Sequence, residues 1–171
     1  MYTQFYGFSE KPFHITPNPD YFYPSRIHSD ALNHLLYALM EKKGFVVITG
    51  VVGIGKTTVC RTLLKQLDDK TRVACLTHSR ISPKQLIEAF LDDLQVPYRS
   101  GNKIQLLSQL NQFLIEQCAA NRSVILILDE AQNLTPAVLE EVRLLSNMET
   151  NEQKLIQIIL LGQPELNDKL S

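Results

Sequence analysis

Eight consecutive residues have the types and spacing of a phosphate-binding loop. Residues 50–57 read Gly-Val-Val-Gly-Ile-Gly-Lys-Thr and fit the pattern G-x-x-x-x-G-K-[ST] at every fixed position. Glycines let the backbone bring its amide groups close to a phosphate chain, and Lys56 supplies a mobile cation for the β- and γ-phosphates. The Thr57 hydroxyl is a suitable ligand for the Mg²⁺ that bridges those phosphates. The predicted nucleotide-binding residues are Gly50, Val51, Val52, Gly53, Ile54, Gly55, Lys56, Thr57 and Thr58.

The segments on either side of this loop place it between a strand and a helix. Residues 45–49 form a short apolar run typical of a buried strand, and residues 58–67 carry apolar side chains on one helical face. The loop amides therefore converge with a helix N-terminus, where the helix dipole favours negative charge. A glycine-rich turn that binds nothing is the alternative, and the strand, the helix, Lys56 and Thr57 together argue against it.

Two acidic residues follow an apolar run later in the chain. Residues 124–128 resemble a central parallel strand buried on both faces, and Asp129 and Glu130 come directly after it, where open α/β sheets bind ligands. The segment resembles a Walker B motif, in which Asp129 holds Mg²⁺ through its water shell and Glu130 polarises a water molecule against the γ-phosphate. Because a kinase needs no such base, the pair favours hydrolysis. A solvated turn is the alternative reading of the same residues.

Composition and charge are those of a globular domain. The chain has 171 residues, of which 44% are hydrophobic and 20% charged, enough for one domain with a sizeable core. The formal net charge of −1 gives no overall attraction to nucleic acid or to an acidic membrane. The apolar runs are strand-sized, and the N-terminus lacks the features of a signal peptide. Scattered cysteines predict buried free thiols in a reducing cytoplasm; they are Cys60, Cys75 and Cys118.

Alternating elements predict an α/β domain with a mostly parallel sheet and helices on both faces. Residues 1–26, rich in aromatic residues and proline, predict an irregular arm packed across a core of residues 27–171. An additional strand lies in sequence between the P-loop strand and the strand before Asp129, together with helices. This insertion favours the three-layer sandwich of the RecA and AAA+ branch over adenylate-kinase-like folds, which place those two strands side by side. Further strands are predicted at 73–77 and 155–161. Helices are predicted at 28–41 and 103–120, and two more begin at a capping box at Ser82 and at Thr135, the second of these ending near Met148.

Several segments resemble one family of ATPases over essentially the whole chain. The family is the cytoplasmic ATPase domain of general secretion pathway protein A, a group of AAA+ proteins that includes pilus-biogenesis and exopolysaccharide-associated ATPases. The aromatic arm and residues 162–166 are the specific parts, whereas the P-loop is generic. The matching segments are Phe5-Tyr6-Gly7-Phe8, Pro12-Phe13, Pro17-Asn18-Pro19, the P-loop, Leu128-Asp129-Glu130-Ala131-Gln132, residues 139–147 and Leu161-Gly162-Gln163-Pro164-Glu165-Leu166.

The resemblance implies site roles and partners. It implies that Gln163 is the polar sensor 1 residue, which contacts the γ-phosphate or the attacking water and acts with Lys56 and Glu130 in catalysis. A solvated turn residue is the alternative for Gln163. It also implies ATP and Mg²⁺ as ligands, with Thr57 and Asp129 on the metal side. The implied partners are further copies in a homo-oligomeric ring of the full-length protein and the proteins of an envelope secretion or pilus system.

The chain departs from the family pattern in two respects. His78 stands where the family usually has an asparagine that restrains the catalytic glutamate; an exposed histidine at a strand end is the alternative. The family continues with a fifth strand, an arginine finger, a helical lid and a membrane span, which we expect beyond Ser171. We therefore expect slow turnover from this chain alone and membrane contact only through the following part. Arg143 lies upstream of the usual finger position, so we do not expect it to act as the finger.

Two other functions stay open at this stage. DNA-associated AAA+ ATPases of the transposition and origin type share the same core, and a stripe of lysine and arginine would favour them. The basic residues are instead dispersed among acids, so nucleic acid is not an expected partner. The second alternative is a nucleotide-binding interaction module without turnover. The dispersed basic residues are Lys42, Lys43, Arg61, Lys65, Lys70 and Arg72.

Overall fold

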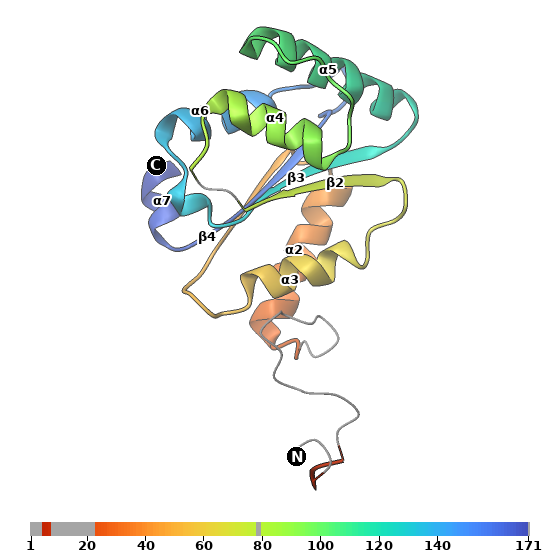
Figure 1. Cartoon of the computed structure of the whole chain (residues 1–171). Coiled ribbons are helices and arrows are strands. Elements are labelled where there is room, and N and C mark those ends of the chain that lie inside the picture. The colour runs from red at the N-terminus through yellow and green to blue at the C-terminus, as the bar shows by residue number, and fades with distance from the viewer. Residues whose placement is uncertain (1–4, 8–22, 78–79, 171) are drawn as a thin grey trace.

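Four parallel strands form the sheet that positions the predicted loops. The computed structural model (Figure 1) describes residues 5–7, 23–77 and 80–170. The strands lie in the order β1-β4-β3-β2, so β4 separates the P-loop strand from the strand that precedes Asp129. The expected separation of these two strands is therefore confirmed. The strands are β1 (Phe45–Thr49), β2 (Thr71–Leu76), β3 (Ser123–Leu128) and β4 (Gln157–Gly162).

The register of the strands brings their carboxyl ends to one edge of the sheet. Thr49 pairs with Gly162 across β1 and β4, and Leu76 pairs with Leu128 across β2 and β3. The residues that follow these ends are the P-loop, the Asp-Glu pair and the segment that contains Gln163. All the predicted site segments that the structure describes thus leave the sheet at the edge where open α/β folds bind ligands.

Helices cover both faces of the sheet, which confirms the predicted three-layer α/β fold. Figure 1 shows α4, α5 and α6 on one face and α2 and α3 on the other. A short 3₁₀ turn, η2 (Ala131–Asn133), follows the Asp-Glu pair, and α7 (Glu165–Leu170) follows β4. The other helices are α2 (Arg26–Met40), α3 (Lys56–Leu64), α4 (Pro83–Asp93), α5 (Lys103–Ala119) and α6 (Pro136–Ser146).

The central strand β3 supplies side chains to both layers of the core. Successive side chains of a strand point to opposite faces of the sheet. Accordingly Leu126 packs with the buried side chains of α4, α5 and α6, and its neighbours Ile125 and Ile127 pack with Leu35 of α2 and Leu63 of α3. This is why the segment reads as an uninterrupted apolar run in the sequence.

Local capping fixes where two of the helices begin. The predicted capping box is confirmed: the Gln85 amide donates to Ser82 Oγ at 3.3 Å, and the Ser82 amide donates to Gln85 Oε1 at 2.8 Å. The same reciprocal arrangement, not predicted, joins Asn102 and Gln105 at the start of α5. Each box satisfies two backbone donors that the helix itself leaves without partners.

Several predicted boundaries are wrong by two residues. The helix after the P-loop begins at Lys56 rather than residue 58, because its first turn faces the loop and carries no apolar signal. β2 begins at Thr71 rather than residue 73. β4 begins at Gln157 rather than residue 155, since Leu155 and Ile156 are buried but lie before the strand ladder.

Two predictions about burial are also corrected. Cys60 is buried and Cys118 half-buried, but Cys75 is exposed because β2 is an outer strand of the sheet. In the aromatic arm, Tyr23 is 83% exposed rather than packed on the core. Most of residues 1–22 lie outside the described part, so the packing of the arm as a whole stays a prediction.

Among the described residues, no helix is both long enough and apolar enough to span a bilayer.

Candidate nucleotide-binding site

The P-loop is held between the ends of β1 and β4. The Gly50 amide donates to the Gly162 carbonyl at 3.1 Å, which ties the start of the loop to the sheet. Gly53 and Gly55 have φ of 79° and 96°. These left-handed conformations are strained for residues with a Cβ atom, so the two glycines let the loop curl around its own amide groups. The structure therefore gives residues 50–57 the tight strand-to-helix turn that the sequence predicts.

Lys56 folds back over the loop that precedes it. Its Nζ donates to the carbonyl oxygen of Gly50 at 2.7 Å and to that of Val51 at 3.1 Å. The ammonium group thus lies at the mouth of the loop, half-buried, with carbonyl oxygens as its partners. Phosphate oxygens are stronger acceptors for an ammonium group than these neutral carbonyls. A bound phosphate chain could therefore replace the carbonyls as the hydrogen-bond partner of Lys56.

Thr57 and Asp129 meet although 72 positions separate them in sequence. The Thr57 hydroxyl donates to Asp129 Oδ2 at 2.9 Å. The Asp129 amide also donates to the Leu76 carbonyl at 3.0 Å, which fixes the carboxylate relative to the outer strand. A hydroxyl and a carboxylate are hard oxygen donors, and Mg²⁺ is commonly held by one or two such groups together with substrate phosphates. The pair therefore fits the predicted magnesium site.

Glu130 lies in the left-handed region of backbone conformation, with φ of 54°. This is uncommon for a residue with a Cβ atom and costs about 1–2 kcal/mol, so its surroundings must hold it there. Its amide donates to Asp129 Oδ1 at 2.9 Å, and its side-chain Oε2 accepts from Gln132 Nε2 at 2.6 Å. The carboxylate is exposed at the end of the sheet, in the position from which it could take a proton from water.

Gln132 is a site residue whose role the sequence reasoning did not identify. Besides binding Glu130, it accepts at Oε1 from the Gln163 amide at 3.0 Å. One side chain thus links the predicted base to the end of β4. The only signal for it in the sequence is its place in the segment Leu128-Asp129-Glu130-Ala131-Gln132, which carries the family resemblance.

The polar contacts of Arg143 lie within its own helix. Arg143 on α6 makes a two-pronged contact with Glu140 of its own helix, with Nε–Oε2 at 2.8 Å and a second nitrogen at 2.7 Å from Oε1. The hydrogen bond to Arg143 lowers the pKa of Glu140, and both side chains are exposed. The expectation that Arg143 is not a finger stays a prediction. His78 lies outside the described residues, so its proposed contact with Glu130 stays a prediction.

The negative charge of Asp129 contributes to the raised pKa values of two cysteine thiols near the site. Burial raises the pKa of Cys60 to about 12, with smaller contributions from Cys75 and Asp129. Partial burial raises the pKa of Cys75, followed by the charges of Asp129 and Asp93. Both cysteines are therefore protonated near neutral pH, and neither has the lowered pKa of a nucleophilic cysteine.

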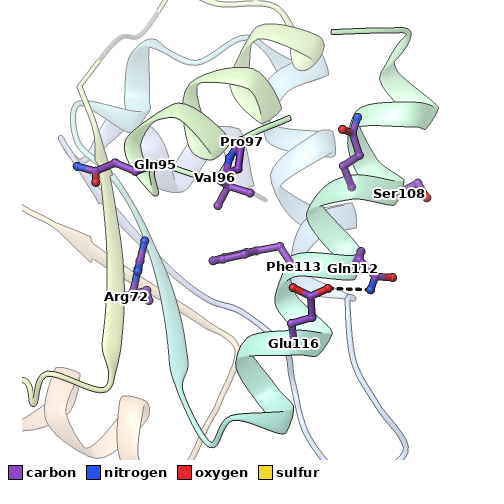
Figure 2. Close-up of a pocket in the computed structure, with 9 residues that line it drawn as sticks. Arg72, Gln95, Val96, Pro97, Ser108, Gln112, Phe113 and Glu116 are labelled. Carbon is purple, nitrogen blue, oxygen red and sulfur yellow. Dashed lines mark hydrogen bonds between the residues drawn. The ribbon is translucent and has the colours of Figure 1, made fainter. Parts of the chain in front are cut away.

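A large hollow lies away from these residues. Its volume is about 600 Å³, and it opens beside the amino end of β2, whereas the P-loop leaves the carboxyl end of β1. Figure 2 shows the Phe113 ring inside it, with Arg72 at one side and the hydrogen-bonded pair Gln112 and Glu116 at the other. The polar side chains of the predicted site meet at the P-loop edge of the sheet and not at this hollow.

Comparison with known proteins identifies the class. Residues 39–170 match the AAA domain family, so the chain belongs to this family. The chain is 49% identical over 172 aligned residues to general secretion pathway protein A of Aeromonas hydrophila, which confirms the resemblance inferred from the sequence. The alignment covers 99% of the chain but 31% of that protein, so the chain spans about a third of the relative's length.

Solved structures confirm the fold. Cdc6p of Pyrobaculum aerophilum superimposes with a TM-score of 0.69 at 20% identity, over 92% of this chain and 43% of that one. The ORC2 protein of Aeropyrum pernix, solved as ADPNP and ADP complexes, gives a TM-score of 0.62 at 17% identity, over 94% and 47% of the two chains. At these identities the similarity shows the arrangement of strands and helices only.

Proposed function

We propose that the chain binds ATP with Mg²⁺ at the P-loop edge of its sheet and is the nucleotide-hydrolysing part of an AAA+ motor. The observation that carries the proposal is the 2.9 Å contact between Thr57 and Asp129. It joins the P-loop to the acidic end of β3, so that one cation could be shared by both segments. Membership of the AAA domain family supports the same assignment.

Each of the predicted site residues has a separate role in this proposal. The loop amides and Lys56 bind and orient the phosphate chain. Thr57 and Asp129 would hold Mg²⁺, which would supply positive charge to the phosphate groups. Glu130 takes a proton from the water molecule that attacks the γ-phosphorus. The bond between the γ-phosphorus and the β–γ bridging oxygen breaks, and the products are ADP and inorganic phosphate.

The position of Gln132 supports a link between the base and the end of β4. Because its amide donates to Glu130 and its carbonyl accepts from the backbone of Gln163, a shift at the end of β4 would alter the orientation of the base. Gln163 is proposed as sensor 1 on this basis and on the family resemblance. Movement of this segment on binding the γ-phosphate would then be transmitted directly to Glu130.

The cellular role is proposed from the relative. The name of general secretion pathway protein A assigns that relative to a secretion pathway, and we propose that this chain serves an envelope secretion or pilus system from the cytoplasmic side, as part of a homo-oligomer. The structural similarity to Cdc6p and ORC2 extends to the fold alone and does not favour a DNA partner. The dispersal of basic residues and the net charge of −1 argue against one.

Binding and hydrolysis are tested separately with two variants of the acidic pair. Glu130→Gln keeps the shape of the side chain but removes the basic oxygen, so ATP binding should persist while phosphate release falls by about 10²–10⁴-fold. Asp129→Asn should instead weaken the dependence of ATP binding on Mg²⁺. The measurements are titration calorimetry and a phosphate-release assay across a range of protein concentrations, because a trans arginine supplied by oligomers normally contributes on the order of 10³-fold or more.

Three outcomes of these experiments separate the alternatives. ATP binding with no phosphate release at any protein concentration would support the module without turnover. Release at the wild-type rate by Glu130→Gln would reject Glu130 as the base. Robust release that does not depend on protein concentration would reject the requirement for an oligomer.

A further inference from the structure

The first turn of α2 contacts the P-loop from outside. The Nε2 atom of His28 lies 2.6 Å from the carbonyl oxygen of Ile54, 26 positions along the chain. The other ring nitrogen, Nδ1, lies 2.8 Å from Ser25 Oγ. Ser25 is the N-cap residue of α2, so the ring is held at its helix end on one side and reaches the loop on the other.

The partners of the ring determine where its proton lies. A carbonyl oxygen can only accept, so Nε2 must carry a hydrogen and donate it to Ile54. The Ser25 hydroxyl can either donate to a bare Nδ1 or accept from a protonated one. Both the neutral and the charged ring can therefore hold the Ile54 carbonyl, and the contact does not depend on which of these two states is present.

This contact orients one peptide plane of the P-loop. In a trans peptide the carbonyl oxygen and the following amide hydrogen point in opposite directions. Because the Ile54 carbonyl points at His28, the Gly55 amide hydrogen must point away from α2. Glycine lies at the end of this plane with φ of 96°, so the backbone alone gives the plane little preference between its two orientations.

The close approach of the ring also explains why Gly55 has no side chain. A Cβ atom added there would lie 3.1 Å from His28 Nε2, closer than such atoms normally come. A larger residue at position 55 would therefore collide with the His28 ring, which packs directly against the loop. Gly53, by comparison, has open space where a Cβ atom would stand, so its need for glycine comes from its φ alone.

We propose that His28 is a positioning residue for phosphate binding: it holds the Ile54 carbonyl outward so that the Gly55 amide hydrogen faces the bound phosphate chain. The inference rests on the proposed nucleotide binding and deepens it. It assigns to α2, outside the P-loop motif, part of the orientation of the loop before the ligand arrives. Without the contact, the 54–55 peptide plane populates both orientations, and binding must select the competent one.

The test compares four variants of the 171-residue chain with the wild type. His28→Ala removes the donor, whereas His28→Gln places an amide N–H near the former position of Nε2. Ser25→Ala removes the support of the ring but leaves the ring itself. His34→Ala is the matched control, because His34 is an exposed histidine on the same helix. Affinities for Mg-ATP and for inorganic tripolyphosphate are measured by calorimetry and competition, and folding is checked by thermal unfolding.

We expect His28→Ala to weaken both ligands about five- to tenfold, which is the scale of one lost hydrogen bond. His28→Gln should stay within about twofold of the wild type, Ser25→Ala should fall between them, and His34→Ala should change nothing. Equal losses for both ligands are essential, because tripolyphosphate has no base or sugar. A loss confined to Mg-ATP would overturn the inference, as would a loss in His28→Gln as large as in His28→Ala.

Failure of the inference can be told from failure of the proposed function. If the wild type binds both ligands and folded His28→Ala binds them equally well, the positioning role is wrong and nucleotide binding stands. If the wild type binds neither ligand, the proposed function is overturned and the inference falls with it. If His28→Ala does not fold, the comparison of His28→Gln and Ser25→Ala with the wild type still decides the matter: losses in the expected order support the role, and a loss in His28→Gln beyond that of Ser25→Ala overturns it.

Discussion

The two faces of the sheet are built differently. On the face covered by α4, α5 and α6, a large cluster of buried side chains fills the space, with Phe90 completely enclosed. On the face covered by α2 and α3, the buried cluster is smaller, and half-buried residues such as Leu32 and Leu36 complete it. The first face is thus mainly structural. The second face bears α3, whose first turn contains Lys56 and Thr57, and α2, which contacts the P-loop through His28.

This difference separates stability from binding. Buried apolar area is the main source of folding free energy, so the α4–α6 face should dominate stability. The polar contacts that arrange the P-loop are few and half-exposed, and hydrogen bonds of this kind contribute little net stability. Changes on the first face should therefore unfold the protein, while changes at the P-loop should leave it folded and unable to bind.

The largest expected effect tests the structural face. Phe90→Ala removes a fully buried ring from α4 and should lower the free energy of unfolding by about 3–5 kcal/mol. Chemical denaturation monitored by circular dichroism measures this. At temperatures where the variant is still folded, its affinity for ATP should match the wild type. A large change in affinity with little loss of stability would contradict the separation of the two faces.

A second effect on the same face comes from an ion pair between α5 and α6 whose carboxylate is buried. Lys103 Nζ lies 2.7 Å from Glu141 Oε2, and the Glu141 side chain is only 3% exposed. Among the described groups, no donor reaches its other oxygen, Oε1. Lys103→Ala should therefore cost about 1–3 kcal/mol, because it leaves a buried carboxylate without its cation.

The double variant provides the control for this pair. Adding Glu141→Gln to Lys103→Ala removes the buried charge and should recover part of the lost stability, measured by the same denaturation experiment. The two side chains are not coupled if Glu141→Gln lowers the free energy of unfolding by the same amount in Lys103→Ala as it does in the wild type.

A smaller effect is expected at the link between Glu130 and β4. Gln132→Ala removes the donor that holds the Glu130 carboxylate at 2.6 Å. We expect phosphate release to fall about five- to tenfold while ATP affinity stays within about twofold of the wild type, because a hydrogen bond to a charged group is worth about 1.5 kcal/mol and acts here only on the base. Asn133→Ala, an exposed neighbour on η2, is the matched control. An equal loss in the control would show that the turn, and not the Gln132 contact, matters.

The smallest test concerns the thiols beneath the site. Alkylation at pH 8 followed by mass spectrometry should modify Cys75 before Cys60. Because both pKa values are raised, both thiols are mostly protonated at pH 8, and the thiolate fraction of each increases as the pH rises. The pKa of Cys60 is about 12, and its side chain is buried. Exposure decides the order, because Cys75 can be reached without unfolding whereas Cys60 cannot. Equal rates for the two cysteines in the folded protein would contradict the burial of α3 against the sheet.

Much of the site was predictable because its signals are local. The spacing of Gly50, Gly55 and Lys56 is a property of consecutive residues, and an apolar run followed by Asp129 and Glu130 is another. The direction of the strands then dictates that both segments meet at one edge. The contact between Thr57 and Asp129 follows from these facts together, although neither segment alone indicates it.

The rest of the site depends on side-chain contacts that produce no periodic pattern in the sequence. His28 reads as one polar position in the first turn of a helix, and its contact with Ile54 depends on how α2 crosses the loop. Gln132 reads as a residue of a turn, and its two partners come from different segments. Side-chain contacts of this kind are set by tertiary packing, whereas local propensity and hydrophobic spacing describe only the elements that carry them.

The most direct test of the account is the affinity of the chain for ATP in Mg²⁺ when Lys56 is replaced. Titration calorimetry compares the wild type with Lys56→Ala and with Lys70→Ala, which removes the same charge from an exposed position just before β2. We expect Lys56→Ala to bind at least about tenfold more weakly, a loss of about 1.4 kcal/mol or more, with an unchanged unfolding midpoint, and Lys70→Ala to bind like the wild type. Equal affinity of folded Lys56→Ala and the wild type would contradict the assignment of the P-loop as the nucleotide site.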